Sequence, residues 1–232
     1  MVPMRRLVRG SRTWLALGFW VALAIVPAVL ERVRVAGHGA DHALLGFYSS
    51  IALPFVAYSV LSAVLGRDGL GVSGIALANF GASPGRVALH TVTVAVVASA
   101  VLGGGLGALV DVIGHGTLDP PLAFDALRAL AAGALGGGAY AAFFAAGASF
   151  GARGWGRSVL LVVDWMFGTS AGTSALFVPR AHIQNLLGGV APLDVSGRTS
   201  YLALASMIVL FTWLACARAS RTRWNPASPG RA

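Results

Sequence analysis

The amino-acid sequence predicts an all-α membrane protein with six membrane-spanning helices. Hydrophobic residues make up 56% of the 232-residue chain and charged residues only 11%, whereas a soluble domain carries about 25% charged residues. The mean hydropathy is +0.76, so the chain cannot cover a globular surface with polar groups and needs the lipid bilayer as its solvent. Six stretches qualify as spans, because each is close to the roughly 20 mostly apolar residues that a membrane helix requires.

The six predicted spans follow one another through short connections that leave no room for a soluble domain. They are about Thr13–Leu30, Leu44–Leu65, Val87–Ile113, Ala126–Phe150, Ser158–Phe177 and Ser200–Ala217. The first resembles a signal peptide, but "ERVRVAG" follows it in place of a small-residue cleavage site, which indicates an uncleaved span. The third and fourth are long enough to tilt, or to break near "LGGGLG" and "LGGGA". The fifth carries Asp164 and the small, polar run "GTSAGTS".

Arginine supplies all 17 basic residues and is concentrated at the ends of the apolar runs. With six spans, twelve arginines fall on one side of the membrane and five on the other. The twelve are Arg5, Arg6, Arg9, Arg12, Arg67, Arg86, Arg153, Arg157, Arg218, Arg221, Arg223 and Arg231. Because cytoplasmic loops carry the excess of basic residues, we predict a multi-pass protein of the inner (cytoplasmic) membrane with both termini in the cytoplasm. Membrane orientation also accounts for the net charge of +9, so no nucleic-acid partner is expected.

One stretch matches a catalytic pattern, G-x-S-x-G, with Ser170 at its centre. In a soluble hydrolase this pattern places a nucleophile on a strand-to-helix turn, and a six-span chain with such a serine and a later histidine is also similar to the intramembrane rhomboid proteases. However, no strand is expected before Ser170, His182 follows without an intervening full span, and the second span lacks H-x-x-x-N. We therefore expect no catalytic residue and interpret the run as small-residue helix packing.

Glycines in the third and fourth predicted spans repeat at a spacing that favours close helix packing. Gly103 and Gly107 are four residues apart, as are Gly133 and Gly137, so each pair shares one face of a helix. A phosphate-binding role is not expected of them, because a P-loop needs a lysine and the chain contains none.

The histidines and the single cysteine give little support for a metal centre. His38 and His42 are four residues apart in a predicted outer loop, with Asp41 between them. A metal site needs three or four convergent ligands, so this partial set is interpreted as a polar loop and no metal is expected. The lone Cys216 excludes an internal disulfide and a multi-cysteine site.

Asp164 is the one carboxylate expected within the apolar zone of a span. It follows Arg157 by seven residues, which is roughly 10 Å along a helix with a rise of 1.5 Å per residue. Carboxylates are costly at such depths and usually face a cavity or a partner. The sequence leaves two interpretations open. Asp164 either contacts a translocation path or is structural, through a pair with an arginine such as Arg157 or through an interhelical hydrogen bond.

The segment from Gly66 to Arg86 joins the second and third predicted spans and is half apolar. It is too polar and too rich in glycine to cross a membrane, and a helix over Leu70–Phe80 places Ile75 and Phe80 near one face. Its glycines weaken an isolated helix by about 1 kcal/mol each relative to alanine. We therefore expect this segment to be steadied by docking against protein.

This layout resembles the permease subunit of ABC-2-type transporters. In that family an N-terminal amphipathic segment precedes six spans, an "E-R-E-x-G-T … P-x-x-R" element joins spans two and three, and a short outer helix or re-entrant stretch precedes span six. Here "MRRLVRGSRTW" corresponds to the first feature and "FVPRAHIQNLLGGVAPLDVSGRTSYLALASM" to the last, while "RASRTRW" forms a basic tail. Arg67-Asp68, Gly74 and Pro84–Arg86 correspond to the joining element. Gly66 and Ile75 depart from it, because they stand where the family has glutamate and threonine.

The resemblance implies a transport subunit and not an enzyme. Residues 1–217 are then a single permease domain and residues 218–232 a basic cytoplasmic tail. The Gly66–Arg86 segment becomes a coupling helix that docks on a separate cytoplasmic ABC ATPase. That partner carries ATP and Mg, and this chain binds no cofactor of its own. The residues implied at the contact are Arg67, Asp68, Leu70, Ile75 and Phe80.

The same resemblance implies an assembly of two permease chains with two ATPase chains. Export is the expected direction, and an amphipathic or lipid-like molecule is the expected substrate, with Asp164 on its path. Two alternatives from other classes stay open at this point. One is a six-span, substrate-binding subunit of a vitamin importer, and the other is an intramembrane protease.

Overall fold

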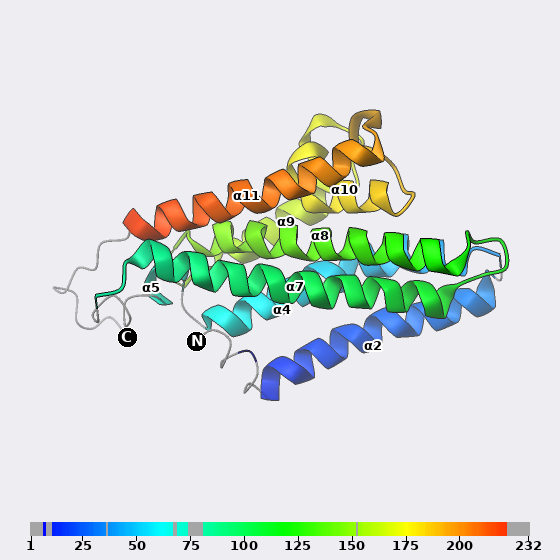
Figure 1. Ribbon diagram of the computed structural model, residues 1–232, viewed down its shortest axis with the longest axis horizontal. Coiled ribbons are helices and arrows are strands. Elements are labelled where there is room, and N and C mark those ends of the chain that lie inside the picture. The colour runs from blue at the N-terminus through cyan, green and yellow to red at the C-terminus, as the bar shows by residue number, and fades with distance from the viewer. Residues whose placement is uncertain are drawn as a thin grey trace.

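The computed structural model describes residues 7, 11–35, 37–66, 69–73, 81–151 and 153–221, without the side chains of Arg12 and Ser73. Throughout these residues the regular secondary structure is helical. Figure 1 shows the long helices running along the length of the molecule, with the shorter α9 and α10 packed against one part of the bundle.

The helices follow one another in a simple order. They are α2 (Ser11–Arg34), α3 (Gly39–Ala43), the π-helix η1 (Leu44–Ala52), α4 (Leu53–Leu65), α5 (Leu70–Ser73), α7 (Pro84–Gly114), α8 (Leu122–Ala148), α9 (Gly156–Phe167), the 3-10 helix η2 (Thr173–Phe177), α10 (Pro179–Leu186), the 3-10 helix η3 (Pro192–Asp194) and α11 (Gly197–Arg221). Since α3, η1 and α4 are continuous, they act as one long helix with a wider π-helical section.

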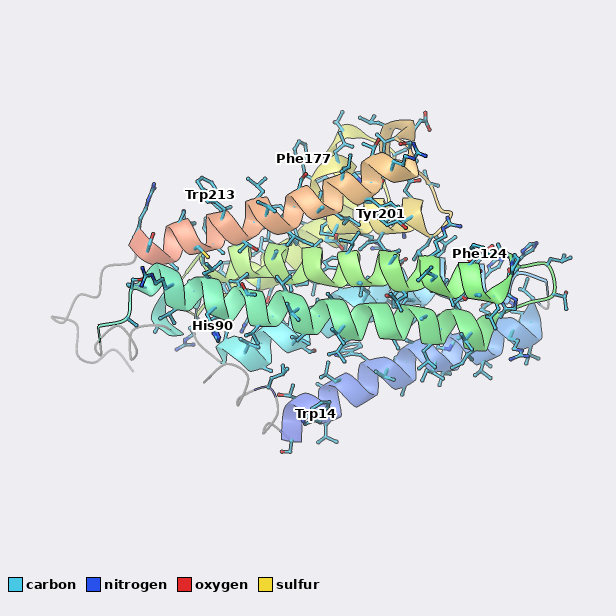
Figure 2. The ribbon with its side chains drawn as sticks, viewed as in Figure 1. Trp14, His90, Phe124, Phe177, Tyr201 and Trp213 are labelled. Carbon is cyan, nitrogen blue, oxygen red and sulfur yellow. The ribbon has the colours of Figure 1, made fainter. Side chains whose placement is uncertain are left out.

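Within the described residues, five helices are long and apolar enough to cross a membrane. They are α2, the α3–η1–α4 helix, α7, α8 and α11. Only 17% of the most apolar window of α2 and 22% of that of α11 are buried inside the bundle, so much of their apolar surface faces outward. Figure 2 shows Trp14 of α2 and Trp213 of α11 on this outer surface, together with the exposed Phe124 at the start of α8. The chain is therefore a helical protein with the surface of a multi-pass membrane protein, as predicted.

The prediction of a continuous helix over Ser158–Phe177 is wrong. Helix α9 ends at Phe167, and a turn, the short η2 and a second turn separate it from α10. The physical reason lies in the run Gly168–Gly172, where two glycines, a threonine and a serine of low helix propensity surround a single alanine. At 12 residues, α9 is about 18 Å long, which is short of the hydrocarbon thickness of about 30 Å. A sixth crossing of the membrane stays a prediction.

Helix α8 lies at the centre of the bundle and contacts α4, α7, α9, α10 and α11. Its closest approach is to α7, where glycines replace side chains. A Cβ atom built on Gly103 would lie 2.6 Å from the carbonyl oxygen of Gly133, and one on Gly107 would lie 2.8 Å from that of Ala129. A Cβ on Gly137 would likewise meet the carbonyl oxygen of Ser99. The small-residue interpretation of the glycine pairs is thus confirmed, and both helices run through them without a break.

Different segments meet at the two ends of the bundle. Helix α2 begins and α11 ends toward the left side of Figure 1, and α5, which follows α4, lies there too. Residue Gly69 packs against the turn after α8, because a Cβ on it would lie 3.0 Å from the oxygen of Gly151 and 3.1 Å from the nitrogen of Gly154. At the opposite end, the backbone N–H of Leu118 donates to the carbonyl oxygen of Gly37 at 3.0 Å.

Two predicted features lie mainly outside the described residues. The N-terminal amphipathic segment before Ser11 is described only at Leu7. The basic tail is described only as far as Arg221, to which α11 continues without a break at residue 217.

Candidate functional site

A buried polar cluster forms around Asp164, where α8, α9 and α10 meet. The hydroxyl of Tyr140 on α8 donates to Oδ2 of Asp164 at 2.9 Å. The backbone N–H of Arg180 on α10 donates to Oδ1 at 3.3 Å. Both Asp164 and Tyr140 are 0% exposed. The carboxylate therefore joins three helices that are separate in the sequence.

The break between α9 and α10 explains how the backbone reaches Asp164. Helix α10 begins with Pro179, which suits the first position of a helix because its missing N–H would have no intrahelical partner there. The N–H of Arg180 is one of the donors that a helix start leaves free, and the carboxylate of Asp164 accepts from it. A negative charge at this position is also favoured by the helix dipole of α10.

If Asp164 has a structural role, the sequence allowed either an ion pair with Arg157 or an interhelical hydrogen bond. The guanidinium of Arg157 lies 5.5 Å above the ring centroid of Tyr58, and no ion pair between Arg157 and Asp164 occurs within the described residues. The interhelical hydrogen bond is formed instead, with Tyr140 as the donor. Sequence reasoning did not find Tyr140, since nothing in the spacing of α8 and α9 indicates which faces meet.

The guanidinium of Arg180 also lies near the carboxylate, and the described residues show no ion pair between the two. The positive charge of Arg180 acts on Asp164, but the Nε atom of Arg180 is buried and has no hydrogen-bond partner within the described part of the chain. A buried donor of this kind costs free energy unless it is satisfied. The cluster thus holds one satisfied anion and one cationic donor that is still available.

An apolar cavity of about 320 Å³ lies beside the cluster. It is lined by Phe55 of α4 and by Leu161, Val162, Trp165 and Met166 of α9. Asp164 is not part of the lining and faces the other side of α9. Helix α9 therefore carries a buried carboxylate on one face and lines an apolar cavity with the other.

Ser170 and His182 do not form a catalytic pair. The hydroxyl of Ser170 donates to the carbonyl oxygen of Phe167 at 2.9 Å. The two ring nitrogens of His182 lie 3.1 Å from the hydroxyl of Ser200 and 3.1 Å from the carbonyl oxygen of Leu176. The contacts of His182 fasten α10 to α11 and to η2. Ser170 lies in the turn after α9, whereas the packing interpretation of the G-x-S-x-G run expected it on a helix.

The histidine loop is tied to a distant part of the chain. Nδ1 of His38 lies 3.3 Å from Oδ1 of Asp119, and the other oxygen of Asp119 accepts from the backbone N–H of Gly116 at 2.7 Å. An open cavity of about 540 Å³ lies above the loop and is lined by His38, Asp41, His42, Leu45 and Gly46. Sequence reasoning missed Asp119 because it follows His38 by 81 residues.

Most residues predicted to contact an ATPase lie outside the described residues. These are Arg67, Asp68, Ile75 and Phe80. The remaining one, Leu70, is only 2% exposed, so its side chain packs into the bundle. The predicted contact of Leu70 with an ATPase stays a prediction.

The class that fold and cluster define is a helical protein of the multi-pass membrane type, with a buried polar cluster beside an interrupted helix. Comparison with protein-family models, with curated proteins and with solved structures finds no match for the chain.

Proposed function

We propose that this chain is the membrane-spanning permease subunit of an ATP-driven ABC exporter. The proposal combines the family resemblance of the sequence with one structural observation. The connection between the second and third long helices begins at the end of the bundle where α2 starts and α11 ends, which is the arginine-rich side of the predicted topology. A cytoplasmic ATPase would reach the chain from that side.

The beginning of this connection is firmly attached to the bundle. Leu70 is buried, and Gly69 packs closely against the turn after α8, since a Cβ on it would lie 3.0 Å from the carbonyl oxygen of Gly151. Helix α5 also contacts α7 and α11. A displacement applied to the connection would therefore reach the ends of α7, α8 and α11 together. In the proposal, ATP and Mg bind to the partner, and closure of the ATPase pair biases two permease chains between two conformations.

The Asp164 cluster supports a role in the translocation path. Irregular backbone at membrane depth is tolerated where it is covered by protein or lines a cavity, and the α9–α10 break is of this kind. The cavity beside α9 is lined by apolar side chains, and Arg180 offers a buried donor nearby. We assign an amphipathic or lipid-like molecule to this region as the exported substrate.

The experiment compares Phe80→Asp with Asn79→Asp in the full chain, co-expressed with its partner. Phe80 is the large side chain on the predicted apolar face, while Asn79 lies off that face and receives the same added charge. Burying an unpaired charge at a contact costs several kcal/mol. Phe80→Asp is expected to lose an ATPase subunit with P-loop sequence, or to hydrolyse ATP without transport, while Asn79→Asp keeps both.

Two results would remove the proposal. One is a parent chain that purifies without any ATPase of this class and whose membranes show no ATP-dependent export. The other is Phe80→Asp that retains both the ATPase and coupled transport.

A further inference from the structure

The glycine contacts between α7 and α8 continue into a pair of facing carboxylates. Gly103 packs on Gly133, and one turn further Gly107 packs on Ala129. Asp111 follows Gly107 by four residues, and Asp125 precedes Ala129 by four. Because residues four apart share a helix face, the same register that brings the glycines together brings these two acids together. His115, four residues after Asp111, lies just beyond the end of α7.

These three side chains converge on one point. One ligand atom from each of Asp111, His115 and Asp125 lies within 4.8 Å of the other two. Asp111 is 0% exposed and Asp125 is 6% exposed. Both carboxylate oxygens of Asp111, Oδ2 of Asp125 and Nδ1 of His115 are buried without a hydrogen-bond partner among the described residues. Buried polar groups in native proteins are normally satisfied, so these unsatisfied atoms on three converging side chains indicate either a bound ligand or a proton that Asp111 and Asp125 share.

The surrounding charge indicates that this ligand is a cation. The charged groups that act on Asp111 are Asp125, Asp119 and Asp41, and all of them are acidic. Of the arginines at this end of the bundle, Arg34 pairs with Glu31 at 3.6 Å, and Arg128 and Arg32 donate to backbone carbonyls. Nε of Arg128 donates to Leu186 at 2.6 Å, and Nη1 of Arg32 donates to Ile113 at 3.3 Å.

The close packing of α7 on α8 also prevents the two acids from separating. Two ionised carboxylates at this distance repel each other strongly in a buried setting. The presence of an imidazole beside the two carboxylates favours zinc, because zinc binds both carboxylate oxygen and imidazole nitrogen, at about 2.0–2.2 Å. A small closure of the three side chains would bring them to such distances around one ion.

We propose that Asp111, His115 and Asp125 bind one zinc ion, which joins the end of α7 to the start of α8. Two carboxylates and one imidazole supply three ligands and neutralise the charge, and water completes the tetrahedral set. An open cavity lined by His38, Asp41 and His42 lies at the same end of the bundle, and the charge of Asp41 acts on Asp111. The sequence alone indicated no metal, because Asp111 and Asp125 become neighbours only through the register of α7 on α8.

The test measures zinc in the full chain, purified in detergent with a histidine-free tag and stripped with a chelator. After equilibrium dialysis against buffered Zn²⁺, the parent is expected to hold about one ion per chain. Asp111→Asn and His115→Gln are expected to lose it. Asp41→Asn is the matched control, since it removes a carboxylate at the same end but outside the three ligands, and it is expected to retain the ion.

Thermal unfolding gives a second readout that guards against a simple folding defect. Without metal, Asp111→Asn is expected to melt above the parent, because it removes repulsion between the two acids. Added Zn²⁺ is expected to raise the melting temperature of the parent and of Asp41→Asn, and to leave Asp111→Asn unchanged. A parent that binds no zinc overturns the proposal and leaves a shared proton between the acids. Zinc that is lost in Asp41→Asn and kept in Asp111→Asn overturns it as well, since the ion then belongs to the loop of His38.

Discussion

The packing of α7 on α8 predicts opposite effects for two glycines that are two residues apart. An alanine Cβ at Gly103 would lie 2.6 Å from the carbonyl oxygen of Gly133 and 2.7 Å from Cδ1 of Leu53, whereas a Cβ at Gly105 meets nothing within 4 Å. Both substitutions replace a glycine of α7 by alanine, so the helix-propensity gain of up to about 1 kcal/mol is common to them. Their difference isolates the packing between the helices.

The expected size of this difference follows from the geometry. Alanine at Gly103 must push α8 and Leu53 away by several tenths of an ångström, and it disturbs the carbonyl of Gly103, which accepts from the hydroxyl of Tyr48 at 2.7 Å. Overpacking of this kind costs about 1–3 kcal/mol. For a chain of this length, 1 kcal/mol shifts the melting temperature by about 2–4 °C. Gly103→Ala is therefore expected to melt at least about 2 °C below Gly105→Ala.

The measurement is thermal unfolding of both purified variants in the same detergent, followed by tryptophan fluorescence and by loss of the monodisperse peak in size-exclusion chromatography. Gly105→Ala is expected to match or exceed the parent. Equal melting temperatures for the two variants would refute the close α7–α8 contact, and with it the register that places Asp111 opposite Asp125.

The remaining predictions concern the Asp164 cluster and the topology. Tyr140→Phe removes a buried hydrogen bond to a carboxylate, which is expected to cost about 1.5–3 kcal/mol, and an unchanged melting temperature would contradict that bond. Asp164→Asn keeps an acceptor but loses the charge. It is expected to reduce export more than stability, and normal export would exclude Asp164 from the path. In a Cys216→Ser background, an impermeant maleimide added to intact cells is expected to label Thr117→Cys and not Ser73→Cys; the reverse pattern would invert the predicted orientation.

The long helices could be predicted from the sequence because each is continuous and strongly apolar. The observed α2, α7, α8 and α11 extend the predicted spans by a few residues at most of their ends. The prediction of the fifth span failed because the run Gly168–Gly172, although visible in the sequence as small and polar, was included in the helix that it ends. The helix-ending effect of these small residues depends on the contacts that satisfy the freed backbone carbonyls, and those come from the hydroxyl of Ser170, from Leu193 of η3 and from His182 of α10.

The polar clusters could be predicted from the sequence only in part. Asp164 could be identified from its type and depth alone, because a carboxylate within an apolar segment is costly wherever it lies. Its partner Tyr140 could not, and neither could the pairing of Asp111 with Asp125. These contacts depend on the rotation and register of one helix against another, and many such registers are compatible with the same pattern of small residues.

The short length of α9 has a consequence for how the protein is made. A helix of about 18 Å is a poor substrate for insertion by the translocon as an independent segment, since it cannot bridge the bilayer. The α9–α10 region must enter the bundle by docking on helices that are already in the membrane, chiefly α8. His182 and Asn185 of α10 both form hydrogen bonds with Ser200 of α11. Helix α11 is synthesised after α10. Assembly around Asp164 is thus completed only after α11 has been synthesised, because a chain that ends before residue 200 lacks the contacts that fasten α10.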